Sequence, residues 1–191
     1  QNTVAYASVV AIPIMFGAMA IPTALLRTAF TAEYPEAGAV LFALAMFQVF
    51  QSINNPLSSA LEGAERVDVK FVASLVGIVV SDPLALLLGW EFGLERVAAA
   101  TVTPELMILM IYQYVVNAEF GEFVLPRPIF EQIASGAIMF LIVSLVADRV
   151  SIIGWIPLLL IIAFRAGVYF ATLLAVSRHL RDTISQLLPF D

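Results

Sequence analysis

The 191-residue chain contains no cysteine, only one histidine and only one lysine. The absence of cysteine excludes disulfides, thiolate nucleophiles and zinc–cysteine sites. A single histidine, His179, excludes a cluster of histidine metal ligands. Charged residues make up 13% of the chain, and the few basic ones are scattered, so the sequence predicts no nucleic-acid partner. We expect no resident cofactor, although a coupling ion such as Na⁺ or H⁺ is left open.

Hydrophobic residues are what the chain has in excess, at 61% of the sequence, with a mean hydropathy of +0.97. Repeated apolar runs of about 20 residues are typical of membrane-spanning helices. The sequence therefore predicts an all-α protein, a polytopic transmembrane helical bundle of about six spans. The predicted helices are Val4–Leu26, Gly38–Leu61, Phe71–Trp90, Val97–Val116, Ile129–Ala147 and Ile152–Val176.

A polar segment with two prolines divides the chain into unequal parts. Residues 1–117 carry four predicted helices, residues 118–128 form a linker, and residues 129–191 carry two more helices and a polar tail. Loop arginines and lysines favour the cytoplasmic side. They place the linker, the tail and both termini in the cytoplasm, because one side collects five basic residues and the other three: Arg66, Lys70, Arg127, Arg178 and Arg181, against Arg27, Arg96 and Arg149.

The second predicted helix carries a polar stripe. Gln48, Gln51, Asn55 and Ser59 recur at spacings of three and four residues, so they lie on one helical face. Unpartnered polar groups are costly against lipid, and we expect this face to line a substrate cavity. Amides and hydroxyls suit the hydroxyl groups of a sugar. Hydrogen bonding between helices explains the same stripe equally well.

Three charged residues lie inside predicted spans, where charge is costly and often functional. Asp82 precedes Pro83 and Glu105 follows Pro104, and a broken helix beside a carboxylate is a candidate cation or proton site for coupling. Counted from the helix ends, the two carboxyls lie at one depth. They could share a proton or a cation, or hold Arg165 between them. Arg165 is assigned to the substrate cavity, where it could bind phosphate, or it could pair with a carboxylate. Helix–helix hydrogen bonding is the alternative for both acids.

Three segments carry a resemblance to a known family. FTAEYPEA at residues 30–37, NNPLSSALEGAERVDVK at 54–70 and WEFGLERVAAATVT at 90–103 resemble the C-terminal half of polysaccharide-exporting flippases of the multidrug/oligosaccharidyl-lipid/polysaccharide superfamily. The resemblance implies that residues 1–117 are part of the C-terminal lobe of a MATE-like transporter. It also implies a missing N-terminal half of the same chain, in keeping with a start, QNTVAYASVV, that has neither an initiator Met nor a basic leader.

The function implied by this resemblance is translocation of a lipid-linked oligosaccharide across the cytoplasmic membrane by alternating access. The implied partners are membrane lipid, the lipid-linked glycan and the other half of the chain. A cation-coupled multidrug exporter of the same superfamily is the alternative. An intramembrane enzyme is disfavoured, because such enzymes usually gather acidic residues in surface loops with His or Lys partners. This chain has only one His and one Lys. A purely structural subunit would use its polar stripe only for packing.

Overall fold

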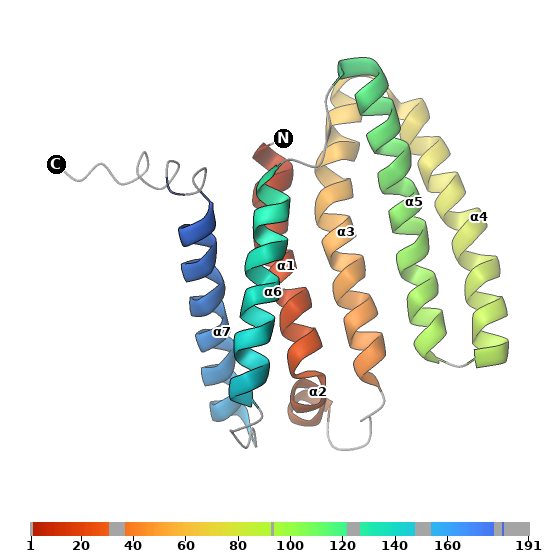
Figure 1. The fold of residues 1–191 in the computed structure, drawn as a ribbon. Coiled ribbons are helices and arrows are strands. Elements are labelled where there is room, and N and C mark those ends of the chain that lie inside the picture. Colours follow the sequence, from red (N-terminus) through yellow and green to blue (C-terminus); the bar gives the residue numbers. More distant parts are fainter. Residues whose placement is uncertain are drawn as a thin grey trace.

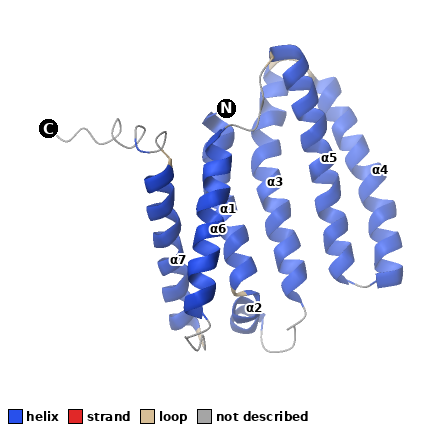
Figure 2. Ribbon diagram, viewed as in Figure 1, coloured by secondary structure: helices blue, strands red, loops and turns tan. Residues whose placement is uncertain are grey.

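The computed structural model describes residues 2–30, 37–92, 94–121, 127–147, 154–177 and 181. Within these residues all regular structure is helical, with no strand (Figures 1 and 2). This confirms the all-α prediction. The helices are α1 Asn2–Ala20, α2 Pro22–Phe30, α3 Gly38–Gly63, α4 Val67–Phe92, α5 Leu94–Phe120, α6 Arg127–Ala147 and α7 Trp155–Val176.

Five helices of the described part are long and apolar enough to cross a membrane: α1, α3, α4, α6 and α7. By length and composition, this is the pattern of a multi-pass membrane protein. The sequence predicts about six spans because it also counts α5, which is not among these five. That helix has 27 residues and packs along both α3 and α4.

The helices are arranged as an open row. Each packs mainly on the next in the spatial order α4, α5, α3, α1, α6, α7, so that α4 and α7 lie at the two ends (Figure 1). Along the direction of the helix axes, the start of α1, the α3–α4 turn and the end of α7 lie at the same end of the molecule, here called the α3–α4 end (Figure 1). Buried apolar side chains follow the line of contacts, among them Ile12 of α1, Leu61 of α3, Val143 of α6 and Leu173 of α7.

The first predicted helix is in fact two helices. α1 ends at Ala20 and α2 begins at Pro22, with Ile21 between them. Proline has no backbone N–H and disfavours the helical conformation in the preceding residue, so Pro22 ends one helix and suits the first position of the next. Pro13, by contrast, lies inside an unbroken α1.

The predicted linker is shorter than its assigned boundaries. Residues 118–120 complete α5 and residues 127–128 begin α6. The fourth predicted helix therefore gains residues at both ends. Near the end of α5, Tyr112 is only 4% exposed, whereas Tyr114 is 76% exposed. Residues 31–36 of the FTAEYPEA segment, residues 122–126 and the tail apart from Ser177 and Arg181 lie outside the described residues.

Candidate functional site

The contact between α3 and α5 holds a buried carboxylate. Glu105 is 7% exposed, and its side chain points toward α3. Gln51 donates from Nε2 to Oε1 at 2.8 Å, and Asn54 donates from Nδ2 to Oε2 at 2.8 Å. The same Asn54 nitrogen also donates to the backbone carbonyl of Glu105 at 3.1 Å. Gln51, Asn54 and Glu105 are called the Glu105 site below.

The Glu105 site contains no positive charge among the residues that the structure describes. Both donors are neutral amides, and the ion pairs of the described part involve Arg66 and Lys70 instead. A buried carboxylate is costly without a counter-charge, so a proton or a cation would stabilise it. Asn54 Oδ1 is buried and lacks a hydrogen-bond partner within the described chain, so it offers a further oxygen. No three His, Cys, Asp or Glu side chains of the described residues gather as a metal site.

Asn54 is a residue of the Glu105 site that the sequence prediction missed. The predicted polar stripe includes Gln51 and Asn55, which are four residues apart. Gln51 and Asn54 are three residues apart and also share a helical face. Asn54 is the more buried of the two asparagines, at 4% exposed. The signal that could have identified it is a pair of amides at helical spacing on one span together with a lone carboxylate on another.

The structure does not bring Asp82 and Glu105 together. Asp82 is exposed on α4 and accepts a hydrogen bond at 3.1 Å from the Ser81 hydroxyl, while Glu105 faces α3. Depth along a helix does not determine which way a side chain points, because that depends on rotation about the helix axis. The two carboxyls therefore stand as separate sites rather than as a shared proton or cation site.

A groove between α1 and α3 is lined by two residues of the predicted polar stripe, Asn55 and Ser59. It has a volume of about 1090 Å³ and includes Ser52, Asn55 and Ser59 of α3 facing Thr3 and Ala7 of α1. We call it the α1–α3 groove. Pro56 also lines it and has no N–H, so the Ser52 carbonyl lacks its helical donor. Gln48 is exposed on α3 and is not among the residues that line this groove, and Gln51 turns to Glu105.

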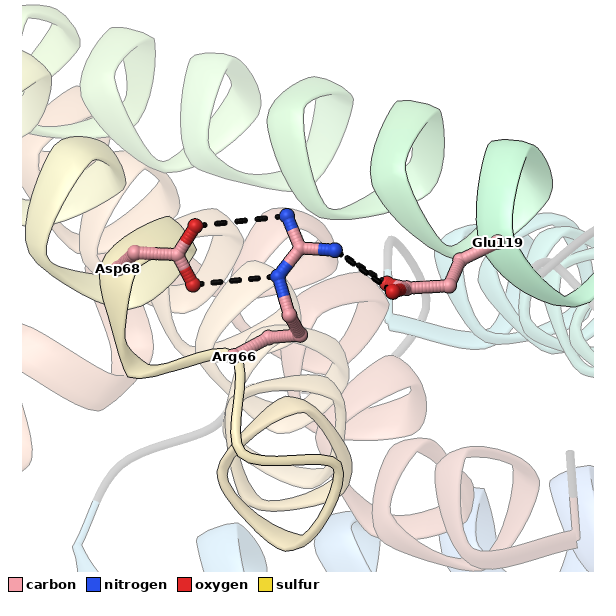
Figure 3. Close-up of polar contacts among 3 residues, drawn as sticks. All are labelled: Arg66, Asp68 and Glu119. Carbon is pink, nitrogen blue, oxygen red and sulfur yellow. Dashed lines mark hydrogen bonds and ion pairs between the residues drawn. The ribbon is translucent and has the colours of Figure 1, made fainter.

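Ion pairs hold the α3–α4 end beside this groove. Arg66 bonds to Asp68 at 3.1 Å and to Glu119 of α5 at 2.7 Å (Figure 3), and Lys70 pairs with Glu62. The hydrogen bonds that Arg66 donates to Asp68 and, with a smaller effect, to Glu119 raise the pKa of Arg66 above its ordinary value. Gly63 and Ala64 line the groove immediately before the α3–α4 turn. The ion pair between Arg66 and Glu119 therefore holds this rim of the groove against the end of α5.

Arg165 lies away from the groove, which corrects its assignment to the same cavity. It is 5% exposed on α7, and its Nη1 lies 4.0 Å from the position that a Cβ of Gly17 would occupy on α1. It lines a separate pocket of about 280 Å³ between α1, α6 and α7. The row explains the separation, because the groove is on the side of α1 that faces α3, while α7 packs with α6 and the opposite side of α1.

Comparisons of the chain with protein-family models, with curated proteins and with solved structures found no match. The functional assignment consequently depends on three features of the molecule: the α1–α3 groove, the Glu105 site and the Arg165 pocket.

Proposed function

We propose that the chain is part of a membrane transporter that moves a lipid-linked oligosaccharide across the cytoplasmic membrane by alternating access. The α1–α3 groove is the observation that carries this proposal. Drug-sized ligands occupy pockets of roughly 300–1,000 Å³, and a groove of about 1090 Å³ suits a larger solute. Its hydroxyl and amide groups can exchange hydrogen bonds with sugar hydroxyls, while its apolar residues tolerate a sugar ring face.

The proposed fold is the C-terminal lobe of a MATE-like transporter. The segment that resembles the flippase family, residues 60–70, begins within the groove-lining part of α3 and continues into the turn that carries Arg66, where a moving lobe would need a firm rim. The row of helices is open, and it exposes large apolar side chains along its length, among them Leu44, Phe71, Leu86, Leu145 and Leu160. Lipid and the other half of the transporter are the surfaces proposed to cover them.

The Glu105 site is proposed to couple transport to a proton or a cation. Gln51 and Asn54 hold the carboxylate from the same turns of α3 that present Ser52 and Asn55 to the groove. Neutralising Glu105 would weaken both charge-assisted hydrogen bonds. The resulting shift of α3 would alter the groove, which links ion uptake to substrate access.

A cation-coupled multidrug exporter is the second candidate, because one observation favours it. An apolar pocket of about 380 Å³ lies between α3 and α5 and is lined by Thr103 and Leu106, the near neighbours of Glu105, and by Phe42, Met46 and Phe50. An apolar pocket next to a buried carboxylate suits a lipophilic cation. This pocket and the α1–α3 groove are separate, so the two functions predict different sensitive residues.

The two candidates can be distinguished by filling one space at a time. The full-length protein would be reconstituted in proteoliposomes with a fluorescent lipid-linked oligosaccharide or a lipophilic cation. Ser59→Trp fills the groove and Met46→Trp fills the apolar pocket. The flippase predicts that Ser59→Trp slows oligosaccharide translocation at least about tenfold, or about 1.4 kcal/mol of barrier, and that Met46→Trp does not. Cation transport that only Met46→Trp blocks would establish the exporter instead.

A further inference from the structure

The guanidinium of Arg165 is buried without a complete set of partners. Its Nε and Nη2 atoms have no hydrogen-bond partner among the residues that the structure describes. Arg165 is the eleventh of the 22 residues of α7, Trp155–Val176, so at a rise of about 1.5 Å per residue it lies roughly 15 Å from either end. An unpaired buried cation is strongly unfavourable. The site therefore requires an anion that no described side chain supplies.

The pocket around Arg165 is otherwise apolar. Its lining includes Pro13 and Gly17 of α1, Met139 of α6 and Phe170 of α7, and it contains no carboxylate. Tyr169, one residue before Phe170, is fully buried, and its hydroxyl also lacks a partner within the described chain. Gly17 leaves space beside the guanidinium, because even a Cβ added at Gly17 would still be 4.0 Å from Nη1.

The pocket opens toward the apolar surface of the row. Four of its lining residues are large, apolar and 40% exposed or more: Val10, Ile14, Ile162 and Phe170. A ligand with a hydrocarbon chain could thus keep its chain on this surface while its anionic group reaches Arg165. The planar guanidinium suits the oxygens of a phosphate in particular.

We infer that the Arg165 pocket binds the phosphate or pyrophosphate of an anionic amphiphile at mid-membrane, with the hydrocarbon chain on the apolar surface of α1 and α7. Phosphates of ordinary bilayer lipids stay at the membrane surface, about 15 Å from this depth. The occupant is therefore a lipid whose head group is in transit. This inference builds on the proposed function, because it identifies where the charged link between glycan and lipid crosses.

Binding of dodecyl phosphate to the full-length protein in nanodiscs tests the pocket directly. We expect Arg165→Gln to weaken binding at least about tenfold, or about 1.4 kcal/mol. Gly17→Leu should weaken it similarly by filling the pocket while keeping the charge. Arg27→Gln, which removes an exposed arginine of α2, is the matched control and should bind as the wild type does. Undiminished binding to both pocket variants would overturn the inference.

Two competitors separate the sources of the anion. Inorganic phosphate and dodecanol should each displace dodecyl phosphate poorly, because each lacks half of what the pocket recognises. Inorganic phosphate that competes as well as dodecyl phosphate would show a free-anion site and overturn the amphiphile. In the ligand-free protein, Arg165→Gln should not lower the thermal midpoint. A clear fall would reveal a structural carboxylate partner and also overturn the inference.

Failure of the pocket and failure of the proposed function give different results. If Arg165→Gln and Gly17→Leu abolish dodecyl phosphate binding but the wild type translocates no lipid-linked glycan, the pocket stands and the flippase does not. If the wild type translocates the glycan and both variants do so at the same rate, the flippase stands and the pocket is not on its path.

Discussion

The Glu105 site shows how one carboxylate can organise a contact between two helices. Each carboxylate oxygen accepts one amide hydrogen bond, from Gln51 and from Asn54, and the backbone carbonyl of Glu105 accepts another. These bonds stabilise the negative charge, but they bring no counter-charge. A site of this kind changes its hydrogen bonding when a proton or cation arrives, which is the property that a coupling site needs.

Replacing Glu105 should uncouple transport, whereas replacing Asp82 should not. Glu105→Gln keeps the shape but cannot gain or lose charge, so we expect ion- or pH-driven transport by the full-length protein to fall at least about tenfold. Asp82→Asn is the matched control, because Asp82 is exposed and bonded only to the neighbouring Ser81 hydroxyl among its described contacts. Initial transport rates at two ion gradients measure both. A loss confined to Asp82→Asn would move the coupling role to α4.

Asn54 and Asn55 should differ sharply in their effect on stability. Asn54→Leu leaves a buried oxygen of Glu105 without its donor, and such a group costs about 1–3 kcal/mol. Asn55→Leu alters an exposed position in the groove and should cost little. Thermal unfolding of the two purified variants gives the comparison. Equal midpoints would mean that the Asn54–Glu105 hydrogen bonds contribute nothing to the fold.

For individual residues, the sequence predicted which polar groups avoid lipid better than it predicted the partners of those groups. Glu105, Gln51 and Arg165 were all identified as polar groups that must avoid lipid, and each is buried or half-buried. Their partners depend on how each helix is rotated about its axis. Helices that are apolar nearly all round, such as α4, carry little information on that rotation. For this reason the sequence predicts Asp82 as a coupling residue, although its side chain is exposed.

Among the helices, α1 and α6 are joined by both polar and steric contacts. The Ser8 hydroxyl donates to Gln132 Oε1 at 2.7 Å, and Gln132 Nε2 donates to the Ala5 carbonyl at 2.8 Å. Gly136, one turn further along α6, faces the ring of Phe16. A Cβ at Gly136 would lie 2.3 Å from Phe16 Cδ2, so the close approach of these two helices requires glycine there.

Gly136→Ala should therefore destabilise the α1–α6 contact. The added methyl group collides with the body of an aromatic ring, and overpacking of this kind costs about 1–3 kcal/mol. Gly167→Ala in α7 is the matched control, since nothing lies within 4 Å of its added Cβ, and alanine should gain up to about 1 kcal/mol of helix propensity. Thermal midpoints measure both, and Phe16→Ala should restore the Gly136→Ala variant. If the double variant is no more stable than Gly136→Ala, the steric explanation is wrong.

Helix boundaries followed from local chemistry where that chemistry is strong. The length of the apolar run predicted the end of α3 to within two residues. The break between α1 and α2 is caused by Pro22, which disfavours the helical conformation in the residue before it. The start of α4 at Val67 was predicted four residues late, because Asp68 and Lys70 look like loop residues. Their pairing with Arg66 and Glu62 makes charge compatible with a first helical turn.

Over the whole molecule, the order of helices in space is what separates the three candidate sites. α1 and α3 are central in the row, with the groove between them, the Glu105 site on the far side of α3 and the Arg165 pocket on the far side of α1. The sequence could not predict this order, because neighbours in the row are often distant in the chain. α1 and α6, for example, join through residues 124 positions apart.

The groove should be open to water from one side of the membrane only. It lies at the α3–α4 end, near Arg66 and Lys70, and basic residues favour the cytoplasmic side. We expect cysteine at Asn55 or Ser59 in the full-length protein to react with a membrane-impermeant maleimide added to inside-out vesicles. Cysteine at Ala45 or Ile53 should not react, because both residues of α3 are buried and neither lines the groove.

Substrate should protect the reactive positions, since a sugar bound by the stripe hydroxyls would cover them. Lipid-linked oligosaccharide is expected to slow labelling at Asn55 and Ser59 and to leave labelling unchanged at Val67, an exposed position at the start of α4. Equal reaction at the exposed and buried pairs would show that the stripe does not line a water-filled groove. Reaction at Asn55 and Ser59 only in right-side-out vesicles would reverse the orientation inferred from the basic residues, while leaving the groove itself in place.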